Sequence, residues 1–363
     1  MKIYYSMPYA FERILGIKLP YEAISSSGWG HLIEQTEIAL VKAGHEIVTN
    51  PHDADIEFFV SQPPFRLKPE MHPTITLSMY ESTRLPSYWA SVYNKFDAVI
   101  NPSHWGKHSY EQSGVTVPIY VVPLGVNTDR FKYVEHKVET KWIYVSQGVQ
   151  LTDRKGLMKV AELFFDGKMP TDTYLLLKTT PHRLAPMHIY GVEMHPQIQW
   201  FQDVLPWEKM TDLLSQCHVS VNPSAGEGFG QLPCEHSLLG MCVLMIYYSG
   251  FEMFANQECN IPIKHREVVS TYYAHGMMAE VDTDDMLQKM LWTYEHQDKA
   301  LAMGKRASEW IAETFTYEKM VTGLLPILEH VVKTVPKTVQ MHQPGDSIDE
   351  WVNRNDTFGF RVA

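Results

Sequence analysis

The sequence predicts an α/β protein with two Rossmann-like, doubly wound domains that face a central cleft. Its 363 residues suit two domains of ordinary size. Short apolar runs alternate with amphipathic segments, as expected for parallel sheets covered by helices. The same pattern starts again after a polar, turn-rich stretch at residues 127–139. Because ligands bind beyond the carboxyl ends of parallel strands, two such units imply a ligand cleft between them.

The N-terminal half begins with an expected strand, KIYYSM, a polar glycine-bearing loop, SSSGWGH, and a helix, LIEQTEIALVKAG. Apolar side chains recur along this helix at helical spacing, and Gly44 ends it before a second strand, HEIVT. Four further apolar runs are expected to be strands: IEFFVS, TITLSMY, DAVINPS and PIYVVPLG. Together these elements form the first predicted domain, residues 1–130.

The C-terminal half repeats this arrangement from KWIYVSQG onward. The run DRKGLMKVAELFFDG is expected to be a loop and a helix, and later apolar runs are expected to be strands: TYLLLKTT, QIQWFQDV, HVSVNPS and CVLMIYYSG. A helical region rich in Met and Leu is expected after them. The second predicted domain spans residues 131–316, and a helix and tail over residues 317–363 are expected to pack back on the first domain.

Composition narrows the possible functions. The formal net charge of −11 argues against a general affinity for nucleic acid or anionic lipid. The four cysteines form no C-x-x-C pair and are expected to be buried free thiols in a reducing compartment. The sequence has neither a signal-peptide pattern nor an apolar run of membrane-spanning length. A cytoplasmic protein, at most peripheral to a membrane, is expected.

The most distinctive stretch is NPSAGEGFGQLPCEHSLLG, residues 222–240, in which three glycines alternate with Glu227 and Phe229. It follows a predicted strand, and Pro233 suits the first turn of a helix. Such a loop presents backbone N–H groups and a helix N-terminus to an anion, and its glycines let a phosphate approach the backbone. The loop therefore predicts a phosphate site.

Two carboxylates flank this site: Glu227 in the loop, and Glu235, which is expected in the first helical turn. Taken singly, Glu227 is explained as a solvated loop residue and Glu235 as a complement to the helix dipole. Together they suit hydroxyl groups, because carboxylates accept hydrogen bonds from hydroxyls well. A ligand with a central diphosphate and a sugar at each end, that is, a nucleotide sugar, fits this pattern.

Other motifs are excluded or have ordinary explanations. The dinucleotide fingerprint G-x-G-x-x-G fails in both glycine loops, because Gln231 and Ile33 stand where the third glycine would be. His104 and His108 have metal-ligand spacing on a helix, but no third ligand is near them in sequence. The D-x-D run that starts at Asp282 directly precedes a helical segment, which favours N-capping. No metal site is expected.

The segment EGFGQLPCE resembles the E-x7-E motif of family 4 of the retaining glycosyltransferases, which have the GT-B fold. Four further segments resemble other elements of that family: SGWGHLIEQTEIALVKAGHEIV, VPLGVN, DRKGL and MGKRASEWIAETFTYEKM. The resemblance implies a hexosyl- or pentosyltransferase that moves a sugar from a nucleotide-diphosphate sugar to an acceptor hydroxyl, with retention of configuration. It implies no cofactor, and no metal for the chemistry.

The resemblance also implies roles at the matching positions of the glycine loop. Glu227 would hold hydroxyls of the donor sugar, and Glu235 would bind the nucleotide ribose. The N–H groups of Gly228, Phe229 and Gly230 would line the sugar and the diphosphate.

Two further elements would complete the donor site. Lys155 would face the diphosphate, and Gly28 and Gly30 would admit it from the first domain. The family usually has an arginine five residues before this lysine, where the chain has Gln150, so Arg154 is the candidate for the second charge. Alternatively, the run DRKG is a surface turn with solvated charges.

In the first domain, the family often places a histidine where this chain has Tyr80 or Glu81. A carboxylate at a strand end suits an acceptor hydroxyl or the donor sugar, and the alternative is that Glu81 caps the following turn. Glu227, Lys155 and Glu81 are the candidate catalytic residues. Two more candidates follow an expected strand end: His182 and Arg183.

Two other functional classes fit the same fold. A sugar-nucleotide epimerase would use the donor without an acceptor, and a sugar-binding pseudoenzyme would bind it without turnover. The intact Glu227, Glu235 and Lys155 argue against the pseudoenzyme. For a transferase, the acceptor is a glycan, a lipid-linked sugar, a small molecule or a modified base in DNA, and the acidic net charge argues against DNA.

Overall fold

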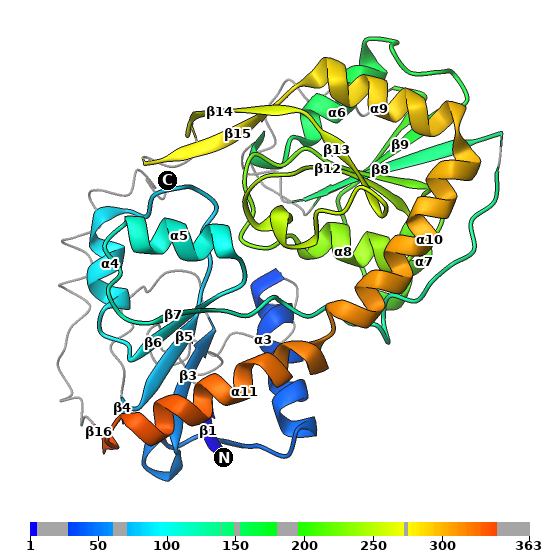
Figure 1. Cartoon of the computed structure of the whole chain (residues 1–363). Coiled ribbons are helices and arrows are strands. Elements are labelled where there is room, and N and C mark those ends of the chain that lie inside the picture. The colour runs from blue at the N-terminus through cyan, green and yellow to red at the C-terminus, as the bar shows by residue number, and fades with distance from the viewer. Residues whose placement is uncertain are drawn as a thin grey trace.

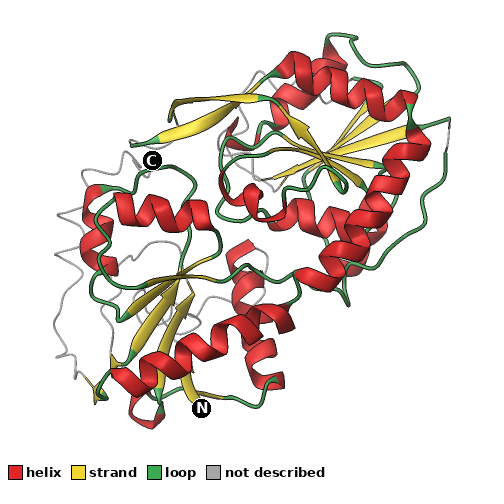
Figure 2. Cartoon of the chain, viewed as in Figure 1, coloured by secondary structure: helices red, strands yellow, loops and turns green. Residues whose placement is uncertain are grey.

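The computed structural model describes residues 1–5, 28–60, 71–138, 140–148, 153–179, 195–271 and 275–339. They form two α/β lobes, each built around a six-stranded sheet (Figure 1, Figure 2). The predicted fold class, two doubly wound α/β units, is confirmed. The four cysteines are buried and free, as expected. In these residues, no helix has both the length and the apolar character needed to cross a membrane.

The first sheet has the strand order β2-β1-β3-β5-β6-β7, with parallel neighbours throughout. Every residue of β3, β5 and β6 is buried, which is expected for a parallel sheet covered on both faces. The strands are β1 (Lys2–Tyr5), β2 (Glu46–Val48), β3 (Ile56–Val60), β5 (Thr74–Leu77), β6 (Ala98–Asn101) and β7 (Ile119–Val121). The helices are α3 (Gly28–Lys42), η1 (Pro51–Asp53), α4 (Ser87–Tyr93) and α5 (His104–Gln112).

The second sheet has the order β10-β9-β8-β11-β12-β13 and is also parallel throughout. Its strands are β8 (Trp142–Gly148), β9 (Thr173–Thr179), β10 (Ile198–Phe201), β11 (Val219–Asn222), β12 (Cys242–Ile246) and β13 (Asn260–Ile263). Its helices are η2 (Asp153–Lys155), α6 (Leu157–Phe165), α7 (Trp207–Leu214), α8 (Gln231–Leu238), η4 (Ser249–Phe254), α9 (Thr283–Glu295) and α10 (Gln297–Thr314).

The strand order of the second sheet places the predicted phosphate elements together. Strand β8 lies between β9 and β11, so the direction of winding reverses between β8 and β11. Ligands of doubly wound sheets bind outside the carboxyl ends of the strands at such a switch point. Lys155 follows β8, and the glycine loop, residues 223–230, follows β11. Both elements therefore lie at one edge of the sheet.

The region after β12 contains a hairpin that was not predicted from the sequence. Residues 260–281 contain β13 and an antiparallel hairpin of β14 (His265–Val269) and β15 (Met277–Val281). The helix begins only at Thr283, where the side chain of Asp282 accepts hydrogen bonds from two backbone N–H groups. The expected helical region rich in Met and Leu corresponds to α9 and α10, which follow the hairpin. The prediction that Asp282 is an N-cap is confirmed.

The chain crosses between the lobes twice, and the two crossings lie side by side. The N–H of Val126 donates to the carbonyl of Phe315 at 2.8 Å, and Val126 forms an isolated parallel bridge with Thr316. After the second crossing, α11 (Tyr317–Thr334) packs against α3 of the first lobe (Figure 1). A last strand, β16 (Thr338–Val339), then pairs with β4 (Met71–His72).

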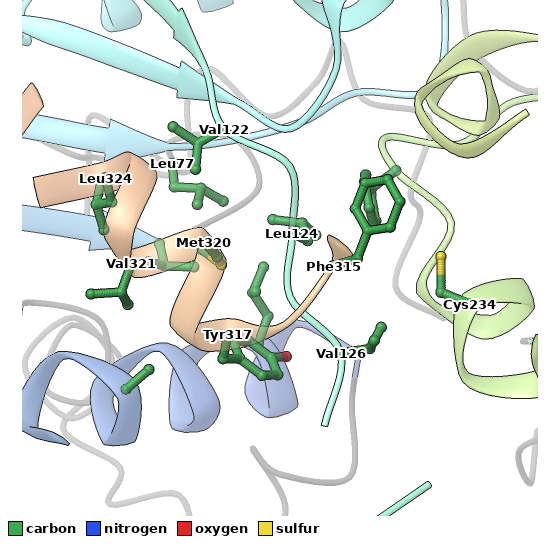
Figure 3. Packing of buried hydrophobic residues seen from close by; sticks show 14 of the residues in the cluster. Leu77, Val122, Leu124, Val126, Cys234, Phe315, Tyr317, Met320, Val321 and Leu324 are labelled. Carbon is green, nitrogen blue, oxygen red and sulfur yellow. The ribbon is translucent and has the colours of Figure 1, made fainter. Parts of the chain in front are cut away.

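Apolar side chains at these crossings join the two lobes into one core (Figure 3). Phe315 is only 5% exposed, and its ring lies 5.9 Å from that of Phe229 and 6.3 Å from that of Phe254, centroid to centroid. Phe229 belongs to the glycine loop. The side chain of this loop residue is therefore held by the core that connects the lobes.

Replacing Phe315 with Ala should lower the free energy of unfolding by about 3–5 kcal/mol, because it leaves a cavity in this core. The control is Phe165→Ala on α6, since that side chain is 54% exposed; a change within about 0.5 kcal/mol is expected there. Urea denaturation of both variants measures the two effects. A loss for Phe315→Ala no larger than that of the control would contradict the joining role of this core.

Candidate active site

Four of the predicted residues come together where the lobes meet. Arg154 and Lys155 form the end of η2, which follows β8, and Glu227 lies in the loop after β11. Glu81 follows β5 of the first sheet. Each residue thus stands beyond the carboxyl end of a parallel strand, and the strands come from both lobes.

Lys155 and Glu227 form a partly buried ion pair. The Lys155 Nζ lies 2.5 Å from Oε1 of Glu227, and the Ser224 hydroxyl donates to the same oxygen at 2.6 Å. The backbone N–H of Glu227 donates to the Ser249 hydroxyl at 2.9 Å. Glu227 is only 7% exposed. The alternative that it is a solvated loop residue is therefore wrong.

Arg154 connects the two lobes electrostatically. Its Nη1 donates to the carbonyl of Gly226 and lies 3.5 Å from Oε1 of Glu227, and its Nη2 lies 3.9 Å from Oε1 of Glu81. The neighbouring Tyr80 is buried instead against Trp89, with ring centroids 4.8 Å apart. Of the two first-lobe candidates, the structure brings Glu81 to the cluster.

The charged groups of this cluster are largely removed from water and shift one another's pKa values. Burial alone would raise the pKa of the Glu227 carboxyl, but the charges of Lys155 and Arg154 outweigh it and hold that pKa below its ordinary value. Burial lowers the pKa of Lys155; Glu227 opposes this shift, and Arg154 adds to it. Lys155 is thus a poorly hydrated cation, for which a further negative charge would be favourable.

The glycine loop packs directly on the first lobe. A Cβ on Gly226 would collide with the Glu81 carbonyl oxygen, and one on Gly228 would collide with the Met79 side chain. Among the described residues, no acceptor takes a hydrogen bond from the N–H groups of the three loop residues that were predicted to line the donor: Gly228, Phe229 and Gly230.

Glu235 lies deeper in its helix than expected. Helix α8 begins at Gln231, after Gly230 at a φ of 106°, so Glu235 lies beyond the first turn. The expectation of a first-turn position is wrong, and with it the helix-dipole explanation. The carboxylate is 6% exposed, and no hydrogen bond or ion pair reaches it from the described residues. Burial raises its pKa to about 8, which the charge of Arg130 partly opposes.

Other predicted residues have different outcomes. Gly28 and Gly30 lie within the helical residues of α3 and not in a loop before it. His104 and His108 are exposed on α5, and the described residues contain no cluster of three His, Cys, Asp or Glu suited to a metal. Three candidates lie outside the described residues: Gln150, His182 and Arg183.

One group near Glu235 was not predicted. Arg130, from the first crossing, donates to Nδ1 of His31 at 3.0 Å and lies 3.6 Å from Glu34. Its guanidinium also lies 5.0 Å above the Trp207 ring of the second lobe. These residues come from three distant parts of the sequence and have no motif of their own, so only the fold brings them together.

Several solved structures are similar to this chain across both lobes. Sucrose-phosphate synthase from Thermosynechococcus elongatus matches with a TM-score of 0.64 at 13% identity, over 85% of this chain and 94% of that one. HepE from Anabaena, in complex with UDP and glucose, matches with a TM-score of 0.58 at 11% identity, over 84% of each chain. A glycosyltransferase from Rickettsia africae matches with a TM-score of 0.59 at 16% identity, over 85% and 83%.

This chain has the GT-B fold. No protein-family model and no curated protein matches the sequence. At these identities the likeness establishes the fold alone. In the GT-B chain the charged cluster lies at the junction of the two Rossmann-like units.

The raised pKa of Glu235 predicts a pH-dependent stability that Glu235→Gln removes. The carboxyl titrates near 4.5 in the unfolded chain and near 8 in the folded one, so between these values the folded state holds an extra proton. Raising the pH from about 5 to 8 should therefore lower the free energy of unfolding, by at most about 1.4 kcal/mol per pH unit. Urea denaturation across this range tests it, with the exposed Glu162→Gln as control. If the free energy of unfolding changes with pH in the same way for the wild type and Glu235→Gln, the raised pKa of Glu235 is contradicted.

Proposed function

We propose that this GT-B protein is a retaining glycosyltransferase of the family 4 type, with a nucleotide-diphosphate sugar as donor. The observation that carries the proposal is the cluster of Arg154, Lys155, Glu81 and Glu227 at the junction of the lobes, beside loop N–H groups that have no acceptor among the described residues. Similar structures support it: HepE forms a complex with UDP-glucose, and the pneumococcal transferase GtfA forms one with UDP and GlcNAc. The proposed acceptor is the hydroxyl of a glycan, a lipid-linked sugar or a small molecule.

The donor's diphosphate is assigned to Lys155 and the loop amides of Gly228 to Gly230. A diphosphate carries charge that a desolvated ammonium and free N–H groups bind well. Glu235 is assigned to the ribose hydroxyls, because its buried carboxyl group has no hydrogen-bond partner among the described residues. The positive charges and amides make a divalent cation unnecessary in this proposal, and the role of Gly28 and Gly30 is to leave room at the start of α3.

Binding and chemistry are linked through the Lys155–Glu227 ion pair. When Lys155 turns to the diphosphate, Glu227 loses its closest cation and becomes an acceptor for hydroxyls of the donor sugar. The bond from the anomeric carbon to the phosphate oxygen then breaks, and Lys155 with the loop amides stabilises the charge that grows on the leaving group. The acceptor oxygen attacks the same face, and its proton passes to the departing phosphate. Glu81 orients that acceptor.

Donor binding is the first test. Calorimetric titration with UDP-, GDP- and ADP-sugars in the presence of EDTA should give saturable binding to one of them. Lys155→Met should weaken that binding about tenfold to a hundredfold, the value of a charge-assisted hydrogen bond of about 1.5–3 kcal/mol. Lys168→Met is the control, because Lys168 is exposed in a surface pair with Asp166. The absence of binding to all three nucleotide sugars, or equal effects of the two variants, would refute the donor assignment.

Glu227→Gln should lower kcat more than it weakens ground-state donor binding, because a carboxylate that holds the sugar contributes most as the glycosidic bond breaks. Steady-state kinetics should show a fall in kcat of about tenfold or more, if a charged hydrogen bond of about 1.5–3 kcal/mol is lost in the transition state. Glu162→Gln, an exposed α6 residue, should leave kcat unchanged. Normal turnover by Glu227→Gln would show that Glu227 does not hold the donor sugar.

A separate assay distinguishes a transferase from an epimerase. A transferase should release nucleoside diphosphate only in the presence of an acceptor.

A further inference from the structure

The β14–β15 hairpin leaves the second lobe and reaches the first (Figure 1). It was not expected from the sequence, and it lies outside both six-stranded sheets. On β14, most side chains are exposed, and its pair Arg266–Glu280 is a surface one. A two-stranded hairpin of this kind has little stability of its own. Its position must therefore depend on the contacts it makes with the two lobes.

At one end, β15 is hydrogen-bonded to the segment that directly follows Glu81. The Met277 N–H donates to the Thr83 hydroxyl at 2.7 Å, and the Thr83 N–H donates to the Met277 carbonyl at 3.3 Å. The Ser82 hydroxyl donates to the His275 carbonyl at 2.7 Å. Gly276 has a φ of 87°, and a Cβ there would collide with the Ser82 hydroxyl.

Two residues further along, the same strand is bonded to the segment that leads to Glu227. The Ala279 N–H donates to the Ala225 carbonyl at 2.8 Å, and the Ala225 N–H donates to the Arg154 carbonyl at 2.7 Å. Met277 and Ala279 lie about 6.6 Å apart along an extended strand. One short strand thus fixes the distance between the loop that carries Glu81 and the loops that carry Glu227 and Arg154.

We propose that the β14–β15 hairpin is an interdomain clasp, and that Thr83 is a positioning residue which holds Glu81 opposite Arg154 and Glu227. The catalytic part of this inference rests on the proposed function. Thr83 acts through the backbone of β15, and its hydroxyl is the acceptor for the Met277 N–H. Without the clasp, the Glu81 loop separates from the glycine loop, while the donor elements of the second lobe stay in place.

The test compares Thr83→Val, which removes the hydroxyl at nearly constant shape, with Thr83→Ser, which keeps it. Hydrogen exchange followed by NMR or mass spectrometry should show the Met277 amide exchanging about fivefold to tenfold faster in Thr83→Val, the effect of losing one hydrogen bond. Thr83→Ser should match the wild type in this exchange rate.

The kinetic readout separates positioning from a general structural role. Thr83→Val should lower kcat about fivefold and leave the affinity for nucleoside diphosphate within twofold, and Thr83→Ser should restore kcat. Wild-type exchange at Met277 in Thr83→Val, or equal behaviour of the two variants, would overturn the clasp. Hydrogen exchange is measured without substrate. If exchange responds as expected but the protein has no transfer activity, the proposed function is refuted and the clasp is not.

Discussion

The partly buried ion pair between Lys155 and Glu227 is the interaction on which the arrangement of the site depends. An unpaired charge at this depth would be costly, so each residue stabilises the other in a place where neither is well hydrated. Ser224 and Ser249 fix the glutamate loop around the pair, and Arg154 extends the cluster to the first lobe. The loops of the site are thus held in shape before any ligand arrives, and in the proposed mechanism the donor then replaces the contact between Lys155 and Glu227 with contacts of its own.

Packing between the two lobes keeps the parts of this site in place. Two parallel sheets end their strands at the same junction, and the side-by-side crossings at Val126 and Phe315 hold the lobes together. Phe229 ties the glycine loop into the shared core through its contact with Phe315, so the loop's backbone is fixed while its N–H groups stay unpaired among the described residues. An anion site requires a loop of this kind, with side chains packed rigidly on one face and backbone N–H groups available on the other.

Much of this follows from local sequence. Buried parallel strands appear as short apolar runs, and the switch between β8 and β11 brings Lys155 and the glycine loop to one edge, so their association was predictable. The depth of Glu235 was not, because it depends on where α8 begins, which is set by the backbone of Gly230. The β14–β15 hairpin was missed because it is stabilised by bonds to Thr83 and Ala225, far away in sequence. Local patterns contain no information on such partners.

The most direct test of the central claim is a crystal structure with the donor nucleoside diphosphate bound. In that structure we expect the Lys155 Nζ to leave Glu227 for a phosphate oxygen. Loop N–H groups from Gly228 to Gly230 should contact the diphosphate, and the ribose hydroxyls should donate to Glu235. A ligand held elsewhere, with the Lys155–Glu227 distance still near 2.5 Å, would contradict it.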